Sequence, residues 1–214
     1  MAEIAEKNIP SSCVYRYQNG LYVNLTNRCP TACAFCIKGA WKMRYRGYDL
    51  RLRKEPAAQE VLREVAGAAA FGELIFCGYG EPAYRLQEML EIARHLKAEW
   101  KKRPDAPRIR LNTVGLGNLI HGRDIVADLT GSIDSISVSL NTADPKQWLR
   151  LMRPAAPYRK EGFESVLGFI RRCARLLPET CVTAVDLPEV DIAKCRSTAR
   201  ALGAKFRLRP ILDP

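Results

Sequence analysis

The stretch "TNRCPTACAFCIKGAW" (residues 26–41) holds three cysteines within eight residues, at the spacing C-x3-C-x2-C. Cys29, Cys33 and Cys36 follow directly on a strand-like segment, "LYVNLT" (21–26), and no histidine or fourth cysteine stands beside them in the sequence. Thiolates are soft ligands that suit zinc or iron–sulfur clusters. A structural zinc site normally closes with four protein ligands. The sequence therefore predicts a metal-binding loop in which one ligand position is not filled by this segment.

Strand-like and helix-like segments alternate along the rest of the chain from this loop. We expect strands at 21–26, 73–78, 108–113, 135–140, 181–186 and 205–210, and helices at about 56–69, 86–101, 124–130, 162–177 and 190–202. Such alternation predicts parallel strands joined by right-handed crossovers. Six units are fewer than the eight of a closed barrel. The predicted fold is therefore α/β, a partial, open (β/α)6 TIM-type barrel.

The predicted domain organisation is simple. Residues 1–20 are polar and lack periodicity, so we expect an N-terminal arm, followed by one core domain over residues 21–214. Residues 38–55 are rich in aromatic and basic side chains without a clear period, which predicts a long loop. A chain of 214 residues is long enough for one domain with a sizeable core.

Polar residues follow the predicted strands at the edge where such sheets bind ligands, the carboxyl ends of the strands. The segment "CGYGEPAYR" (77–85) follows the second strand, and "NTVGLGNLIHGRD" (112–124) follows the third. The later strands add Ser137, Ser139, Asp186, Arg207 and Arg209. We expect these groups to converge with the cysteine loop on one face.

The motifs in this order resemble those of a known family. "CPTACAFC" resembles the C-x3-C-x-aromatic-C signature of radical S-adenosylmethionine (SAM) enzymes, with Phe35 as the aromatic. "GYGEP" (78–82) resembles their GGEP motif with Tyr79 at its first glycine, and "LNTVG" and "SVSLN" resemble later strand ends of the same family. The resemblance covers roughly residues 20 to 210. Within the superfamily, the chain looks most like the small proteins associated with the TatD nuclease family.

The resemblance implies two cofactors, a [4Fe–4S] cluster and SAM. Cys29, Cys33 and Cys36 would ligate three irons, and SAM would chelate the fourth. Reductive cleavage of SAM would then give a 5′-deoxyadenosyl radical that abstracts hydrogen from a substrate. The residues implied in SAM binding are Phe35, Gly78, Tyr79, Gly80, Glu81, Asn112, Ser139 and Arg209.

The substrate-side residues follow from position alone. His121 and Asp186 follow predicted strands and are the candidate catalytic residues. For each of them, a structural role as a hydrogen-bonding loop residue is at least as consistent with the sequence. Cys173, Cys181 and Cys195 are expected to act as small core hydrophobes. Cys77 is expected to pack behind GYGEP, and Cys13 has no assigned role.

The formal net charge of +11 favours acidic partners. The expected partners are a small-molecule or phosphorylated substrate, an electron donor such as flavodoxin or ferredoxin, a TatD-family nuclease, and nucleic acid. A rival hypothesis is a metal- or cluster-stabilised basic module that binds nucleic acid or an acidic protein, and a third is an activase of a protein partner. The sequence shows neither a known nucleic-acid module nor aromatics interleaved with basic residues on one face.

The sequence also bears on location. No run of about eighteen apolar residues predicts a membrane span. The first residues lack the basic and apolar regions of a secretory signal. We therefore expect a cytoplasmic protein with no membrane association.

Overall fold

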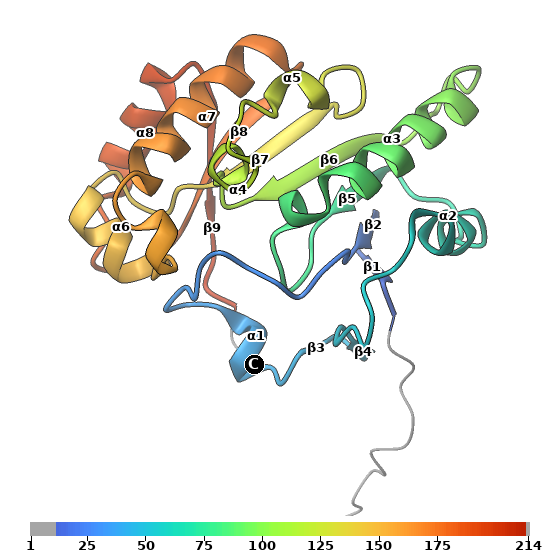
Figure 1. Cartoon of the computed structure of the whole chain (residues 1–214), viewed down its shortest axis with the longest axis horizontal. Helices are drawn as coiled ribbons and strands as arrows, with labels where there is room; N and C mark the ends of the chain where they lie inside the picture. Colours follow the sequence, from blue (N-terminus) through green and yellow to red (C-terminus); the bar gives the residue numbers. More distant parts are fainter. Residues whose placement is uncertain (1–11, 213–214) are drawn as a thin grey trace, which may run out of the picture.

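The computed structural model describes residues 12–212 (Figure 1). Its centre is a seven-stranded sheet in the order β1-β2-β5-β6-β7-β8-β9. The first two strands pair antiparallel, and every later neighbour pairs parallel. The strands are β1 (Val14–Tyr17), β2 (Gly20–Val23), β5 (Glu73–Phe76), β6 (Arg108–Thr113), β7 (Ser135–Ser139), β8 (Thr180–Val185) and β9 (Lys205–Arg209). The six parallel strands confirm the predicted partial, open barrel.

The helices follow the parallel strands and cover one face of the sheet. They are α2 (Ala58–Ala66), α3 (Leu86–Trp100), α4 (Gly117–His121), α5 (Val126–Leu129), α6 (Pro145–Met152), α7 (Gly162–Leu176) and α8 (Ile192–Ala201), with the 3-10 turns η1 (Pro82–Arg85) and η2 (Ala156–Tyr158). Figure 1 shows α3, α7 and α8 along this face, which we call the outer face. Among the described residues, no helix is long and apolar enough to cross a membrane.

The two faces of the sheet differ in chemistry because side chains alternate along a strand. Outward positions such as Phe76, Leu111 and Val138 are fully buried in the main hydrophobic core with the helices. Inward positions are polar on the later strands, and they include Asn112, Ser137, Ser139, Thr183, Arg207 and Arg209. We call this the inner face; it is the one that can receive a polar ligand.

The N-terminal arm needs correction over the residues that the structure describes. Val14–Tyr17, predicted as part of the arm, forms β1 and pairs with β2 at one edge of the sheet. Hydrogen bonds along the ladder, together with burial of Val14 and Tyr15, fix this segment. Residues 1–11 of the predicted arm lie outside the described residues.

The predicted long loop at 38–55 also has structure. The helical turn α1 (Ile37–Ala40) is followed by a hairpin of β3 (Arg44–Tyr45) and β4 (Tyr48–Asp49). Buried Tyr15, Leu50 and Tyr79 form a cluster with the hairpin tyrosines. Tertiary packing of aromatic rings orders this segment, and such packing leaves no helical or strand period in the sequence.

Helix α6 is an element that the sequence analysis missed. It begins at Pro145, after Asp144, whose carboxylate accepts a hydrogen bond of 2.6 Å from the backbone N–H of Gln147. Its buried side chains are Trp148, Leu151 and Met152. Eight residues give too few turns for a periodicity argument, although Asp-Pro is a readable helix start.

Candidate active site

The cysteine loop is attached to the end of α6. Three backbone hydrogen bonds of 2.8 to 3.1 Å join the two segments: Ala32 N–H to Arg153 O, Ala34 N–H to Leu151 O, and Ala155 N–H to Pro30 O. Thr31 and Pro154 add an antiparallel bridge between them. The loop is therefore ordered by backbone pairing with a helix end that lies more than a hundred residues later.

The three predicted metal ligands are neighbours in the cysteine loop. The sulfur atoms of Cys29 and Cys33 each lie 3.4 Å from the hydroxyl oxygen of Thr31. The charge of Cys36 acts on the pKa of both other thiols. Burial raises the pKa of the Cys29 thiol and raises that of Cys33 to about 11, so these thiols need a nearby cation to ionise at neutral pH.

The thiols fit a multi-iron cluster better than a single ion. Within residues 12–212, no three Cys, His, Asp or Glu side chains converge closely enough to bind one metal ion. In a [4Fe–4S] cluster each thiolate binds its own iron, so the sulfur atoms stand further apart than around one ion. Three exposed or half-exposed cysteines on a loop at the carboxyl edge of the sheet match that donor set.

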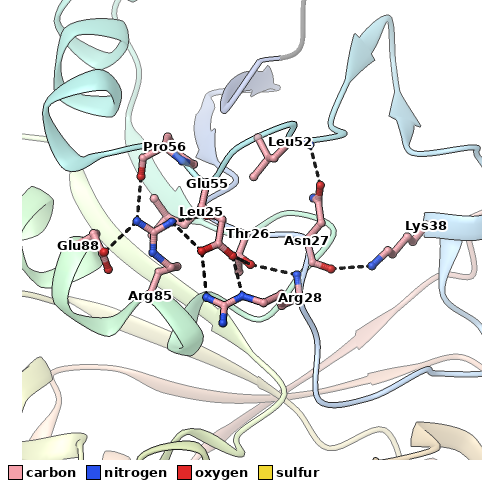
Figure 2. A network of polar contacts seen from close by, with 10 residues as sticks. All are labelled: Leu25, Thr26, Asn27, Arg28, Lys38, Leu52, Glu55, Pro56, Arg85 and Glu88. Atoms are coloured by element: carbon pink, nitrogen blue, oxygen red, sulfur yellow. Dashed lines mark hydrogen bonds and ion pairs between the residues drawn. The ribbon is translucent and has the colours of Figure 1, made fainter.

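A carboxylate fixes the residue that precedes Cys29. Glu55 accepts hydrogen bonds from Arg28 Nε at 2.7 Å and from Arg28 Nη2 at 3.0 Å (Figure 2). The same carboxylate pairs with Arg85 at 3.2 Å, and Arg85 also pairs with Glu88 at 2.9 Å. Glu55 thus connects the start of the cysteine loop to the start of α3.

A second anchor of the loop is Asn27, next to Arg28. Its Oδ1 accepts from Leu52 N–H at 2.7 Å (Figure 2). Its Nδ2 donates to Leu50 O at 3.0 Å. The ammonium group of Lys38 donates to the backbone oxygen of Asn27 at 2.7 Å. No role was predicted for Asn27, Arg28 or Glu55; the available signal was the polar run "NLTNR" (24–28) directly before the first thiol.

The glycines of GYGEP are required by packing against the cysteine loop. A Cβ atom at Gly78 would stand 2.1 Å from Asn24 Oδ1, and one at Gly80 would stand 2.2 Å from the backbone oxygen of Thr26. Tyr79 between them is buried and points away from this contact, with its hydroxyl donating to Arg44 O at 2.6 Å. Tyr79 therefore replaces the family glycine without entering the glycine contacts.

Glu81 is a buried anchor between two strand ends. Its carboxylate accepts hydrogen bonds from the Thr113 hydroxyl at 2.8 Å, from Val114 N–H at 2.7 Å and from Ala83 N–H at 3.0 Å. Burial raises the pKa of this carboxyl, while the three hydrogen bonds oppose that rise. Its backbone N–H donates to Arg28 O at 2.8 Å. These contacts support a role for Glu81 in orienting the GYGEP turn, and its contact with SAM stays a prediction.

Three predicted SAM-binding residues lie on the inner face. Arg209 donates from Nη2 to the Ser139 hydroxyl at 3.4 Å. Asn112 Oδ1 is buried without a hydrogen-bond partner among the described residues, and the Asn112 side chain lowers the pKa of the nearby Cys77 thiol against the effect of burial. Burial raises the pKa of Cys77, in line with its predicted position behind GYGEP. Unpaired polar atoms on the inner face give a polar ligand donors and acceptors to meet.

The remaining predicted site residues are dispersed. Phe35 packs between the main core and the smaller cluster that contains Leu151. His121 lies at the end of α4, where its Nε2 contacts the backbone oxygen of Ala83 at 2.7 Å. Asp186 is exposed directly after β8. Among the described residues, no hydrogen bond or ion pair joins His121 to the cysteine loop. Its hydrogen bond to Ala83 is that of a structural loop residue. Catalysis by His121 and Asp186 stays a prediction.

Asn141 and Met152 are residues of the site whose contacts the sequence analysis missed. Asn141 is buried in a left-handed backbone conformation with φ of 64°. Its side chain accepts from Val185 N–H at 3.2 Å and donates to the sulfur of Met152 at 3.1 Å. The Asn that closes "SVSLN" was visible in the sequence, whereas the Met at the end of α6 carries no such signal.

Comparison with known proteins agrees with the motifs. The model of the radical SAM superfamily matches residues 23–202. No curated protein matches the sequence. Among solved structures, a radical SAM methyltransferase from Sphaerobacter thermophilus superposes with a TM-score of 0.58 at 14% identity, over 92% of this chain and 68% of that one.

Two further structures share the fold. SuiB from Streptococcus suis gives a TM-score of 0.58 at 16% identity over 87% of this chain, and methylornithine synthase (PylB) gives 0.53 at 15% identity over 90%. This chain spans only 38% and 53% of those two chains. Because the family model covers most of the sequence, the chain belongs to the radical SAM superfamily, whose members are enzymes that use a [4Fe–4S] cluster and SAM.

Proposed function

We propose that this radical SAM enzyme abstracts a hydrogen atom from a small anionic substrate. One observation supports the assembly of a working site: the backbone hydrogen bond of 2.8 Å from Glu81 N–H to Arg28 O. It joins the GYGEP turn to the residue before Cys29. The two motifs on which the family resemblance rests are therefore in direct contact at the carboxyl edge of the sheet.

The residues divide into three roles under this proposal. Cys29, Cys33 and Cys36 hold the cluster, which supplies the electron that cleaves SAM when both are bound. Arg209 and Ser139 offer donors to the carboxylate and ribose of SAM, Asn112 offers its unpaired oxygen, and Phe35 offers a ring face to adenine. The buried Tyr79 and the aromatic cluster around it limit the access of water from the hairpin side.

The test is anaerobic reconstitution with iron and sulfide. We expect a brown protein with absorbance near ~400 nm, as thiolate-bound clusters show, and release of 5′-deoxyadenosine on addition of SAM and dithionite. Cys33→Ala should lose iron and product. Cys173→Ala is the matched control, because Cys173 is buried in α7 and lies outside the loop. A protein with full iron content that never releases 5′-deoxyadenosine would contradict the proposal.

The finer assignment of partners rests on the sequence and charge. A TatD-family nuclease is the partner suggested by the narrower resemblance, and flavodoxin or ferredoxin is the class of electron donor that the chemistry needs. Co-purification from a native source, followed by reduction assays with each purified donor, tests both. A donor that reduces the cluster should replace dithionite in the release of 5′-deoxyadenosine.

Nucleic acid is a second candidate partner because of the β3–β4 hairpin. Trp41 stacks on Tyr45 with ring centroids 5.5 Å apart, and the Arg46 guanidinium lies 4.9 Å from the Tyr17 ring centroid. The sequence analysis expected no such combination of aromatic and basic groups on one face. Bases stack on such surfaces. A single-stranded oligonucleotide should bind with an affinity that falls with salt and with Arg46→Ala; salt-independent binding would exclude this candidate.

A further inference from the structure

Five basic side chains on the inner face come from β6 and β9, and three of them have acidic partners. Arg108 and Lys205 pair with Glu179 at 2.7 and 2.8 Å, and Arg110 pairs with Glu73 at 2.9 Å. These three lie toward the amino ends of the strands. Glutamates therefore neutralise the basic side chains at the amino ends of the strands on the inner face.

Arg207 and Arg209 differ from the other three. In the described part of the chain, no carboxylate lies within ion-pair distance of either guanidinium; instead, Arg207 donates to the Ser137 hydroxyl at 3.3 Å and Arg209 to Ser139 at 3.4 Å. Both side chains reach across β8 to serines of β7. A guanidinium has five N–H donors, so one long bond to a hydroxyl leaves most of them available.

The surroundings of Arg209 make its charge costly without an anion. Burial lowers the pKa of Arg209, and the neighbouring charge of Arg207 lowers it further. The Nε atom of Arg209 is buried and has no acceptor among residues 12–212. The guanidinium groups of Arg207 and Arg209 therefore offer free N–H donors and positive charge on a polar face of the sheet. An anion bound there would accept from these donors and offset the charge.

The two arginines lie at different depths. Strand β9 runs from Lys205 to Arg209, so Arg209 lies nearer the carboxyl edge of the sheet, where the cysteine loop lies. Arg207 pairs in register with Thr183 and Arg209 with Val185, which places Arg207 one two-residue step deeper, or about 7 Å.

The two arginines, at different depths on the inner face, can bind two anionic groups. The carboxylate of SAM is one, and Arg209, nearer the cluster, is the residue proposed for it above. We propose that Arg207 and Ser137 form a second anion site that binds a carboxylate or phosphate of the substrate. This inference rests on the proposed function, since it names the substrate class of that same site. The Arg207 side chain is exposed, so a ligand can reach it across the inner face.

The test measures anion binding to the reconstituted protein with SAM present, so that Arg209 is occupied. The probes are inorganic phosphate and malonate, titrated by calorimetry at constant ionic strength. Arg207→Gln removes the positive charge and the paired N–H donors of the guanidinium. Ser137→Ala removes the hydroxyl and leaves both arginines in place. Arg94→Gln is the matched control, because Arg94 is an exposed arginine on α3. The probe that binds more tightly identifies phosphate or carboxylate as the substrate's group.

We expect Arg207→Gln to weaken that probe by about tenfold or more, Ser137→Ala by a smaller factor, and Arg94→Gln not at all. Release of 5′-deoxyadenosine without substrate should be unchanged in Arg94→Gln. Equal affinity in Arg207→Gln and the unaltered protein, or failure of the unaltered protein to bind either probe, would overturn the inference. If Arg207→Gln does not fold, an unchanged affinity in Ser137→Ala overturns it instead.

The two proposals fail separately. An unaltered protein that binds the probe through Arg207 but never cleaves SAM would remove the proposed function and leave the anion site standing. A protein that cleaves SAM and binds both probes equally well without Arg207 would keep the function and remove the site.

Discussion

The thiol of Cys33 lies 3.8 Å from the thioether sulfur of Met152, although 119 positions separate them in the chain. The Asn141 side chain donates to the same sulfur at 3.1 Å. The middle cysteine of the cysteine loop is thus connected, through one methionine, to the residues just after β7. Met152 is fully buried, so it positions this thiol from within the core.

Met152→Ala is expected to loosen the cysteine loop. Truncation of a fully buried methionine leaves a cavity and lowers the free energy of unfolding by about 2–5 kcal/mol. The iron content after reconstitution should fall as well, because Cys33 loses its contact. Met152→Leu keeps the volume and should cost less than about 1.5 kcal/mol. Urea unfolding and iron analysis check both; full iron retention in the alanine variant would argue against a positioning role.

Gly80→Ala is expected to displace the GYGEP turn. The new Cβ would stand 2.2 Å from Thr26 O and 2.7 Å from Arg28 O, and backbone atoms cannot swing aside as a flexible side chain can. We expect a loss of about 1–3 kcal/mol in unfolding free energy and weaker cluster retention. Gly168→Ala, in open space on α7, should instead stabilise the protein by about 0.5–1 kcal/mol. Thermal melts of the two variants should move in opposite directions.

Glu81→Gln tests the buried anchor. The glutamate oxygens accept three hydrogen bonds from donors, and an amide replaces one acceptor with an NH2 group that faces a donor. A buried unsatisfied group costs about 1–3 kcal/mol. Glu164→Gln, at an exposed position of α7, should change stability by less than about 0.5 kcal/mol. Equal unfolding midpoints in urea would show that Glu81 does not anchor the strand ends.

Acid stability should depend on Glu179. Hydrogen bonds and charge from Lys205 and Arg108 lower the pKa of this carboxyl from 4.5 to about 2. Because the pKa is lower in the folded than in the unfolded chain, its contribution is complete above pH 4.5 and is lost as the pH falls toward 2. Glu179→Gln should therefore flatten the fall in melting temperature over that range. If the melting temperature of Glu179→Gln falls as steeply with decreasing pH as that of the unaltered protein, this assignment is contradicted.

The central sheet could be predicted from the sequence because its strands are bounded by local signals. The predicted strand at 108–113 matches β6 residue for residue, and its outward positions Ile109 and Leu111 are fully buried. The first parallel strand ends earlier than predicted, at Val23. Just beyond Val23, the Asn24 side chain donates to Leu50 O, a contact with a distant segment that no local pattern encodes.

The donor set of the candidate site was readable, whereas its supports were not. The three cysteines and GYGEP are short motifs with their own spacing, so they need no partner to be recognised. The packing of Gly80 against Thr26, the pairing of the cysteine loop with Arg153 and the contact between Cys33 and Met152 are all long-range. Such contacts form only when distant segments are brought together by the folded sheet, and the local sequence pattern does not specify which segments meet.

The position of β9 at the end of the sheet has a consequence for association between copies of this chain. One edge of β9 has no strand partner among the described residues, so its backbone groups are open to pairing with another strand. A second copy aligned against this edge would bring Lys205, Arg207 and Arg209 close to the same residues of its neighbour. Mutual repulsion between these charges would oppose such edge-to-edge pairing of two copies.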